Sequence, residues 1–181
     1  MSEPRKKGRR AYLSHYKKKE DGGYAYTGKM YTCESSEDYK HIKLRLWLFV
    51  GCIFACVVAA GCVSPPGANG QIFVLLPYVA GLMTAVSLVW AMCRLSVRGP
   101  ALEEHVYEAT AKAIPIRAMA VLILMVLSLA GLIVYVCFNG FEDKFIHFLI
   151  SCLTQALSIV FCLALWRYMK TISWRDVPSQ N

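Results

Sequence analysis

Four long stretches of this 181-residue chain contain almost no charged side chains. They cover residues 44–63, 72–93, 118–138 and 146–165, and each is about 20 residues long. A helix that rises ~1.5 Å per residue needs about 20 residues to cross the ~30 Å hydrocarbon core of a membrane. A helical bundle in water would keep a polar face on every helix, and these four stretches do not. The sequence therefore predicts an all-α integral membrane protein, a bundle of four transmembrane helices.

The basic residues are concentrated on one side of the predicted membrane. The first 45 residues contain 12 of the 20 lysines and arginines, and seven more lie between spans two and three or after span four. The two other connections contain only Lys144. Because cytoplasmic loops carry the excess of lysine and arginine, both termini are expected in the cytoplasm. An uncleaved first span after a short basic N-terminus favours a bacterial plasma membrane.

The predicted spans divide the chain into three parts. Residues 1–43 are a basic, tyrosine-containing N-terminal segment, residues 44–168 are the membrane domain, and residues 169–181 are a cytoplasmic tail. We expect the basic residues 1–20 to contact anionic lipid headgroups, and we predict neither nucleic-acid nor nucleotide binding. The similar heptads TAVSLVW and QALSIVF lie 71 residues apart and are compatible with two tandem helical hairpins.

The stretch GYAYTGKM, residues 23–30, has the spacing of a phosphate-binding loop. It carries Met30 where a serine or threonine would hold Mg²⁺, and polar and charged residues precede it where a buried apolar strand would be needed. We therefore interpret the spacing as coincidence. Strand-forming residues on both sides of Thr27–Lys29 predict a small tyrosine-rich hairpin or loop instead. Ser35 or Ser36 is expected to cap a helical turn before the first span.

The connection between spans two and three predicts an amphipathic helix at about residues 101–113. Pro100 suits a helix start, and two glutamates follow in the first turn. The apolar residues at helical spacing are Leu102, Val106, Ala109 and Ala113. Pro115 would end this helix before the third span. We expect the helix to lie along the membrane or against a partner.

Polar side chains recur along the fourth span. This polar stripe consists of His147, Ser151, Thr154, Gln155 and Ser158. Gln155 is the most costly member, because an amide near the middle of a membrane needs hydrogen-bond partners; Thr84 and Ser87 on span two and Ser128 on span three are the expected ones. The stripe either bonds helices together or forms a polar binding site. The candidate ligand-binding residues are Gln155, Thr154, Ser158, Ser151 and Thr84.

Small residues at intervals of four define a candidate packing surface. They are Gly51, Ala55 and Ala59 on span one, and Gly81 and Ala85 on span two. Small residues at this spacing let two helix backbones approach closely. We expect this surface to pack within the bundle or against another subunit.

The sequence contains little that points to catalysis. No Asp, Glu, Lys or Arg lies deep in a span, where proton relays and ion-coupled transporters usually carry one. His105 and Glu108 alone would be a weak pair of metal ligands. We therefore expect a non-enzymatic protein without metal or cofactor, which acts as an accessory subunit or scaffold of a larger membrane assembly with a protein partner or as a homo-oligomer. The alternative is a small oligomeric carrier or channel that passes a neutral or apolar solute along the polar stripe.

The eight cysteines leave a third hypothesis open. Cys62 and Cys137 lie near the external ends of their spans, and a membrane thiol oxidoreductase would require such a reachable pair. No C-x-x-C motif occurs, and packing between helices explains the cysteines with fewer assumptions. Residues 57–64, VVAAGCVS, also resemble a lipobox with lipidation at Cys62, although the preceding segment is far longer than usual.

Overall fold

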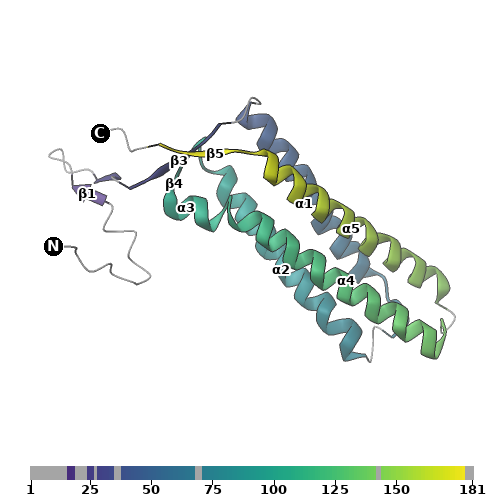
Figure 1. The fold of residues 1–181 in the computed structure, drawn as a ribbon. Helices are drawn as coiled ribbons and strands as arrows, with labels where there is room; N and C mark the ends of the chain where they lie inside the picture. Colours follow the sequence, from purple (N-terminus) through teal and green to yellow (C-terminus); the bar gives the residue numbers. More distant parts are fainter. Residues whose placement is uncertain are drawn as a thin grey trace.

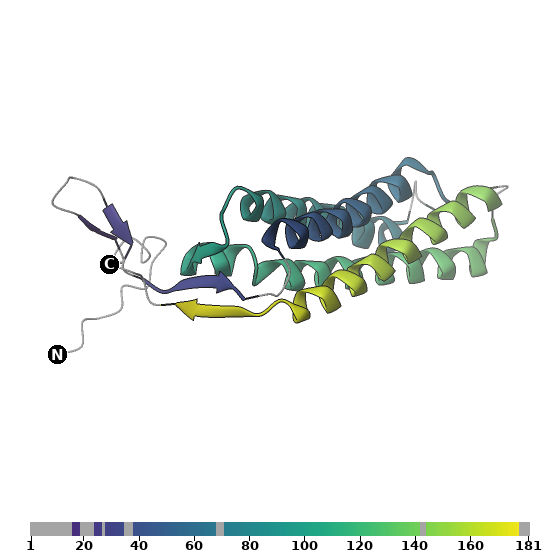
Figure 2. The same cartoon turned by 90° about the horizontal axis from the view of Figure 1, so that it is seen from above.

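Four long helices dominate the fold and run side by side (Figure 1; Figure 2). The computed structural model describes residues 16–18, 24–26, 28–34, 38–67, 71–141 and 144–177. The helices are α1 (Tyr39–Cys62), α2 (Ile72–Ser96), α4 (Ala113–Asn139) and α5 (Phe145–Thr171). Each is long and apolar enough to cross a membrane. The chain is thus a multi-pass membrane protein, and the predicted four-helix bundle is confirmed.

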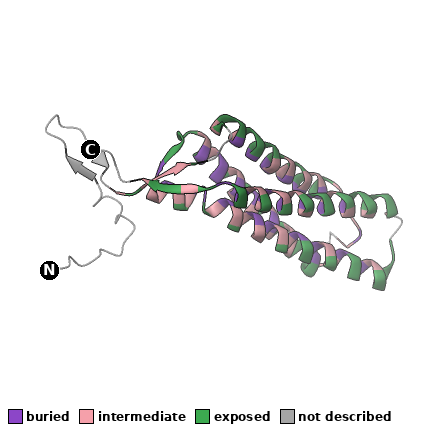
Figure 3. Ribbon diagram, turned by 45° about the horizontal axis from the view of Figure 1, so that its top comes forward, coloured by how far each residue is buried: buried purple, intermediate pink, exposed green. Residues whose placement is uncertain are grey.

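Each long helix packs against two neighbours. α1 and α4 both contact α2 and α5, so α1 and α4 lie diagonally opposite. The contacts follow helical periodicity: α1, for example, buries Ile42, Leu46, Val50, Ile53 and Val57. Figure 3 shows buried stretches mainly where the helices face one another and exposed stretches mainly on their outer sides. The outer sides carry many exposed large apolar residues, as expected of surfaces that face lipid.

The helices are longer than the apolar stretches that predicted them. α1 begins at Tyr39, α4 begins at Ala113, and α5 continues to Thr171. Hydropathy marks only the part of a helix in the hydrocarbon, whereas its hydrogen bonding continues where long basic side chains reach the headgroups. The cap of α1 is Asp38, whose carboxylate accepts a 3.3 Å hydrogen bond from the Lys40 backbone N–H; the expected caps at residues 35 and 36 lie outside the described residues.

A three-stranded antiparallel sheet lies at one end of the bundle, which we call the strand end (Figure 1). Its central strand is β3 (Met30–Cys33), flanked by β4 (Ala101–Glu103) and β5 (Trp174–Val177). The opposite end, with the connections 63–71 and 140–144, is called the loop end. The sheet joins the N-terminal segment, the connection after α2 and the C-terminal segment. The expectation of an all-α fold is therefore wrong at this end.

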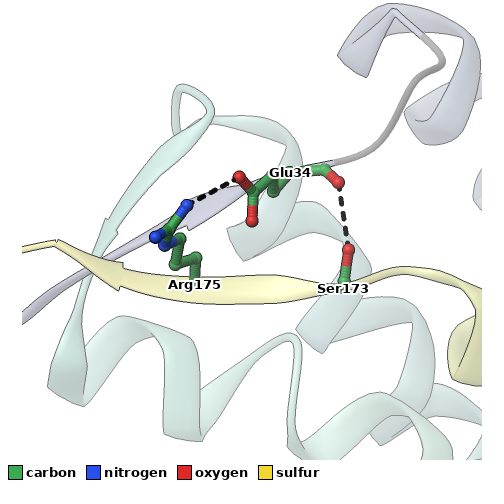
Figure 4. A network of polar contacts seen from close by, with 3 residues as sticks. All are labelled: Glu34, Ser173 and Arg175. Carbon is green, nitrogen blue, oxygen red and sulfur yellow. Dashed lines mark hydrogen bonds and ion pairs between the residues drawn. The ribbon is translucent and has the colours of Figure 1, made fainter.

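Polar contacts extend the pairing of β3 and β5 beyond the strands themselves (Figure 4). The Glu34 backbone N–H donates to the Ser173 carbonyl at 3.1 Å, and the Ser173 hydroxyl donates to the Glu34 carbonyl at 3.0 Å. The Arg175 guanidinium lies 3.0 Å from the Glu34 carboxylate. This ion pair is exposed, so the backbone bonds contribute most of the connection between the two segments.

Contacts between aromatic rings connect the sheet to the short helix α3 (Glu104–Ala109). The ring of Tyr107 stacks on Tyr31 of β3 with centroids 4.2 Å apart, and its centroid lies 5.5 Å from that of Trp174 of β5. Leu102 and Val106 are buried in the main core of the bundle. The sheet and α3 are thus continuous with the core of the membrane domain.

The predicted helix at 101–113 is wrong in its bounds. Residues 101–103 form β4, α3 spans only Glu104–Ala109, and a turn at residues 110–112 precedes α4. The Thr110 hydroxyl in this turn is buried and donates to the Val106 carbonyl. Pro115 does not end the preceding helix, because it lies in the first turn of α4, where a backbone N–H has no partner within the helix. Helical periodicity could not show that β4 pairs with a strand some 70 residues earlier in the sequence.

The predicted tyrosine-rich hairpin is also wrong in its pairing. β2 (Tyr24–Tyr26) pairs with β1 (Tyr16–Lys18), whereas β3 pairs with β4 and β5. The residues have strand propensity, but propensity does not identify the partner strand. Lys29 is followed by a strand rather than by the helix that a phosphate-binding loop requires.

Candidate functional site

The buried face of α5 changes character along its length. Cys162, Leu165 and Met169 are buried toward the strand end, whereas Ser151, Gln155 and Ser158 are buried toward the loop end. On α4, the buried Ser128 lies between Met125 of the main apolar core and Leu132 of a smaller apolar cluster. We call Ser128, Ser151, Gln155 and Ser158 the polar layer. This layer interrupts the apolar core of the bundle.

A cavity of about 180 Å³ adjoins the polar layer. Its lining comes from all four long helices and from the connection between α1 and α2. The polar residues that line it are Ser64, Tyr78, Ser128, Ser151 and Gln155, and the apolar ones include Val74 and Leu132. A mostly apolar wall with a few polar groups is typical of small-molecule sites.

Gln155 is the most unusual residue of the cavity wall. Its side-chain N–H donates to the Ser151 hydroxyl oxygen at 3.0 Å, and the residue is only 3% exposed. Its amide oxygen is buried and accepts no hydrogen bond from any described residue. A buried polar atom without a partner costs about 1–3 kcal/mol. The interior of the bundle beside the cavity therefore contains a strong acceptor that the described protein groups do not satisfy.

Tyr78 was missed as a site residue in the sequence. Its hydroxyl donates to the Val57 carbonyl at 2.9 Å and so connects α2 to α1 beside the cavity. This approach depends on Gly61, since a Cβ at that position would overlap the Tyr78 hydroxyl. The available signal was the tyrosine itself, because a phenolic hydroxyl within an apolar span needs a polar partner.

The structure places only some of the predicted ligand residues at the cavity. Gln155 and Ser151 line it, as does the expected partner Ser128. The Thr154 hydroxyl donates to the Ile150 carbonyl at 2.9 Å, and the Thr84 hydroxyl donates to the Ala80 carbonyl at 2.8 Å. Both threonines are thus satisfied within their own helices. Ser158 and Ser87 are not among the lining residues; Ser87 also bonds within its own helix.

The predicted small-residue surface is divided between two environments. Gly81 and Ala85 are buried, and a Cβ on Gly81 would lie 3.1 Å from the Met125 sulfur of α4. Gly51 and Ala55 are exposed, and no described atom outside its own backbone lies within 4 Å of a Cβ built on Gly51. Ala59 is half-buried. The α2 positions therefore pack inside this bundle, whereas the α1 positions 51 and 55 face outward.

Cysteine and metal chemistry receive no support from the geometry. None of the eight cysteines, all of which are described, forms a disulfide. Cys62 and Cys137 are both exposed but belong to the diagonal helices α1 and α4. Within the described ranges, no group of three or more His, Cys, Asp or Glu residues could hold a metal ion. The His105 Nδ1 instead lies 3.4 Å from a Glu103 carboxylate oxygen.

The chain matches no protein-family model, no curated protein and no solved structure.

Proposed function

We propose that this chain is a non-enzymatic subunit or scaffold of a larger membrane assembly. The observation that carries the proposal is the outward face of α1, where Gly51 and Ala55 are exposed and no described side chain of another helix lies within 4 Å of a Cβ built on Gly51. The occupant of this face is a transmembrane helix of another subunit. Small residues at this spacing let two helix axes come close enough for backbone contacts.

The cost of an outward glycine supports this interpretation. Glycine is about 1 kcal/mol less favourable than alanine within a helix, and a lipid-facing position offers no packing to offset that cost. A second surface suits a scaffold as well: the sheet at the strand end joins three segments of the chain, and β4 and β5 form its two edges. Strand edges can pair with an extended segment of another protein.

The proposed placement puts the strand end in the cytoplasm of a bacterium. It rests on the excess of lysine and arginine in the segments at that end, which also suits anionic lipid headgroups. Both termini would then be cytoplasmic, in the plasma membrane. The repeated heptads on α2 and α5 further suggest that α1–α2 and α4–α5 are tandem hairpins.

The experiment that tests the subunit proposal is native mass spectrometry after gentle extraction from the source membrane. We expect a stoichiometric foreign partner with the wild-type chain. Ala55→Leu should release it, because a leucine there fills the close-contact face. Ala130→Leu is the matched control, since Ala130 is also exposed but lies on α4. A wild-type chain that is always monomeric, or equal loss of the partner in both variants, would contradict the proposal.

A second candidate function is a small carrier for a neutral or apolar solute. The observation that favours it is the cavity beside the polar layer, inside a membrane bundle. Gln155→Leu distinguishes the two candidates. A subunit would keep its partner with at most a modest loss of stability, whereas a carrier would lose flux at a normal expression level.

A further inference from the structure

We propose that Arg117 of α4 binds the phosphate of an anionic phospholipid where α4 meets α2 near the strand end. The site is separate from the outward face of α1, so it goes beyond the subunit function. It is also more specific than the attraction of basic segments to headgroups, because one guanidinium at one depth of the membrane defines it.

Arg117 is the only charged residue of α4 and lies one turn after the start of this helix at Ala113. Its guanidinium Nη1 donates a 2.6 Å hydrogen bond to the Ser87 carbonyl of α2. This bond holds the guanidinium against the neighbouring helix at a defined position along the bundle.

The charge of Arg117 has no acidic partner in the described part of the chain. None of the four long helices contains an Asp or Glu. The ion pairs that the described residues form join Glu34, Glu103 and Glu108 to other side chains. One carbonyl satisfies one N–H but does not neutralise a guanidinium, which stays charged in proteins. Ionisable residues at membrane depth usually pair with another group, so we expect a partner from the surroundings.

Other N–H groups of Arg117 are within reach of such a partner. A guanidinium carries five N–H donors, and the bond to the Ser87 carbonyl uses one of them. Arg117 is only half-buried. It does not occur among the described side chains that have a fully buried polar atom without a hydrogen bond. Its unbonded nitrogens therefore reach the surface of the bundle, where they can donate to a ligand.

Arg117 lies at the depth of the lipid phosphates. The part of α4 from Arg117 to Asn139 is ~33 Å long at ~1.5 Å per residue, and the hydrocarbon core of a membrane is ~30 Å thick. When Asn139 lies at one edge of this core, Arg117 lies at the other. Trp90, one turn after Ser87 on α2, marks the same level, because it is 65% exposed and indoles prefer the headgroup region.

A phospholipid supplies the negative charge that this position lacks. A planar guanidinium can donate two parallel N–H bonds to a phosphate, which an ammonium group cannot do. Toward the loop end from Arg117, the outer sides of α2 and α4 are apolar and exposed, for example at Met83 and Ile123, and suit acyl chains. Arg94 on α2 is exposed near the strand end and adds positive charge, which favours a lipid with a net negative charge. Inorganic phosphate offers the same oxygens but would have to leave water for the edge of the hydrocarbon, so the lipid is the ligand.

Native mass spectrometry of the full chain, titrated in detergent with phosphatidylglycerol or phosphatidylcholine of identical acyl chains, tests the proposal. We expect the first phosphatidylglycerol to bind wild type at least about tenfold more tightly than it binds Arg117→Gln, because the substitution removes charge-assisted hydrogen bonds. The affinity for phosphatidylcholine should change by a smaller factor, because that lipid has no net charge.

Arg167→Gln is the matched control. Arg167 is exposed on α5, one turn before the end of that helix at Thr171, so the control removes the same charge at the same end of the bundle. This variant should bind phosphatidylglycerol like wild type. Equal binding of phosphatidylglycerol by wild type and Arg117→Gln, or equal losses in the two variants, would overturn the proposal.

A measurement on wild type decides the matter if Arg117→Gln does not fold. The full chain is treated with p-hydroxyphenylglyoxal, which modifies arginine, in phosphatidylcholine nanodiscs with or without phosphatidylglycerol, and the modified peptides are quantified. We expect phosphatidylglycerol to lower the modification of Arg117 several-fold and to leave that of Arg167 unchanged. An Arg117 that is unreactive in phosphatidylcholine alone, or equal protection of both arginines, would contradict the proposal. Protection of Arg117 by inorganic phosphate in phosphatidylcholine nanodiscs would contradict it as well, since the ligand would then be a soluble anion.

Discussion

The two halves of the bundle differ in how completely their helices pack. Toward the strand end, the four helices, α3 and β4 share one apolar core that includes Leu88, Met92 and Leu165. Toward the loop end, the buried residues of α5 are Ser151 and Gln155, and a cavity separates the helices. In lipid, the hydrophobic effect adds little to contact between helices, so tight packing determines where they adhere. The strand half is therefore the more completely packed part, and the loop half is the part that contains a cavity.

The contrast predicts responses of different size to the same substitution at two buried alanines. Ala91 is 0% exposed in the main core, and Ala60 is 3% exposed but lines the cavity. Ala91→Leu should lower the free energy of unfolding by about 1–3 kcal/mol, because the extra carbons have no space. Ala60→Leu should change it by less than about 0.5 kcal/mol, because the cavity accepts them. Reversible denaturation in mixed micelles measures both, and equal losses would show that the loop half is packed as tightly as the strand half.

A smaller effect separates a packed glycine from an outward one. A Cβ on Gly131 of α4 would lie 3.0 Å from the Phe73 carbonyl oxygen of α2. Residue 77 is a proline, so that carbonyl lacks its usual donor four residues later, and α4 approaches it closely through Gly131. Gly131→Ala should therefore destabilise the bundle in spite of its better helix propensity. Gly51→Ala should stabilise the isolated chain by up to about 1 kcal/mol. The same denaturation assay measures both changes in the free energy of unfolding. Two changes of equal sign would contradict the assignment of Gly131 to a packed face and of Gly51 to an outward face.

The sequence predicted the features that depend on local pattern. Four apolar stretches identified the four long helices, and the cost of burying an amide identified Gln155 as the polar residue that most needs an explanation. Gly81 and Ala85 were expected to pack, and both are buried. These properties are set by single residues or by helical periodicity.

The sequence did not predict the features that depend on distant pairing. β3, β4 and β5 are three or four residues long, and nothing in a segment as short as Ala101–Glu103 identifies its partner. The prediction that Thr84 and Ser87 form hydrogen bonds with Gln155 was wrong for a related reason. Both hydroxyls donate to carbonyls of their own helix, which are always within reach. Hydropathy also gave no sign that Gly51 and Ala55 face away from the bundle, because apolar spans lack a clear polar side.

The sheet at the strand end is the central structural claim, because it makes the N-terminal segment, the connection after α2 and the C-terminal segment one unit. Trp174→Cys tests it directly, since Trp174 lies opposite the native Cys33. The neighbouring pair Glu34 and Ser173 is hydrogen-bonded through its backbone, so positions 33 and 174 form the closer, non-hydrogen-bonded kind of pair. Their Cα atoms should then be ~4.5 Å apart, which is within the range of a disulfide.

The measurement is peptide mass spectrometry of isolated membranes after mild oxidation. The account predicts a disulfide between Cys33 and the introduced cysteine in Trp174→Cys. It predicts no such link in the control Asp176→Cys, because residue 176 lies opposite Tyr31 instead. If the introduced thiol of Trp174→Cys stays open to alkylation, or if that of Asp176→Cys links to Cys33 equally well, the terminal segments do not form this sheet and the account is wrong.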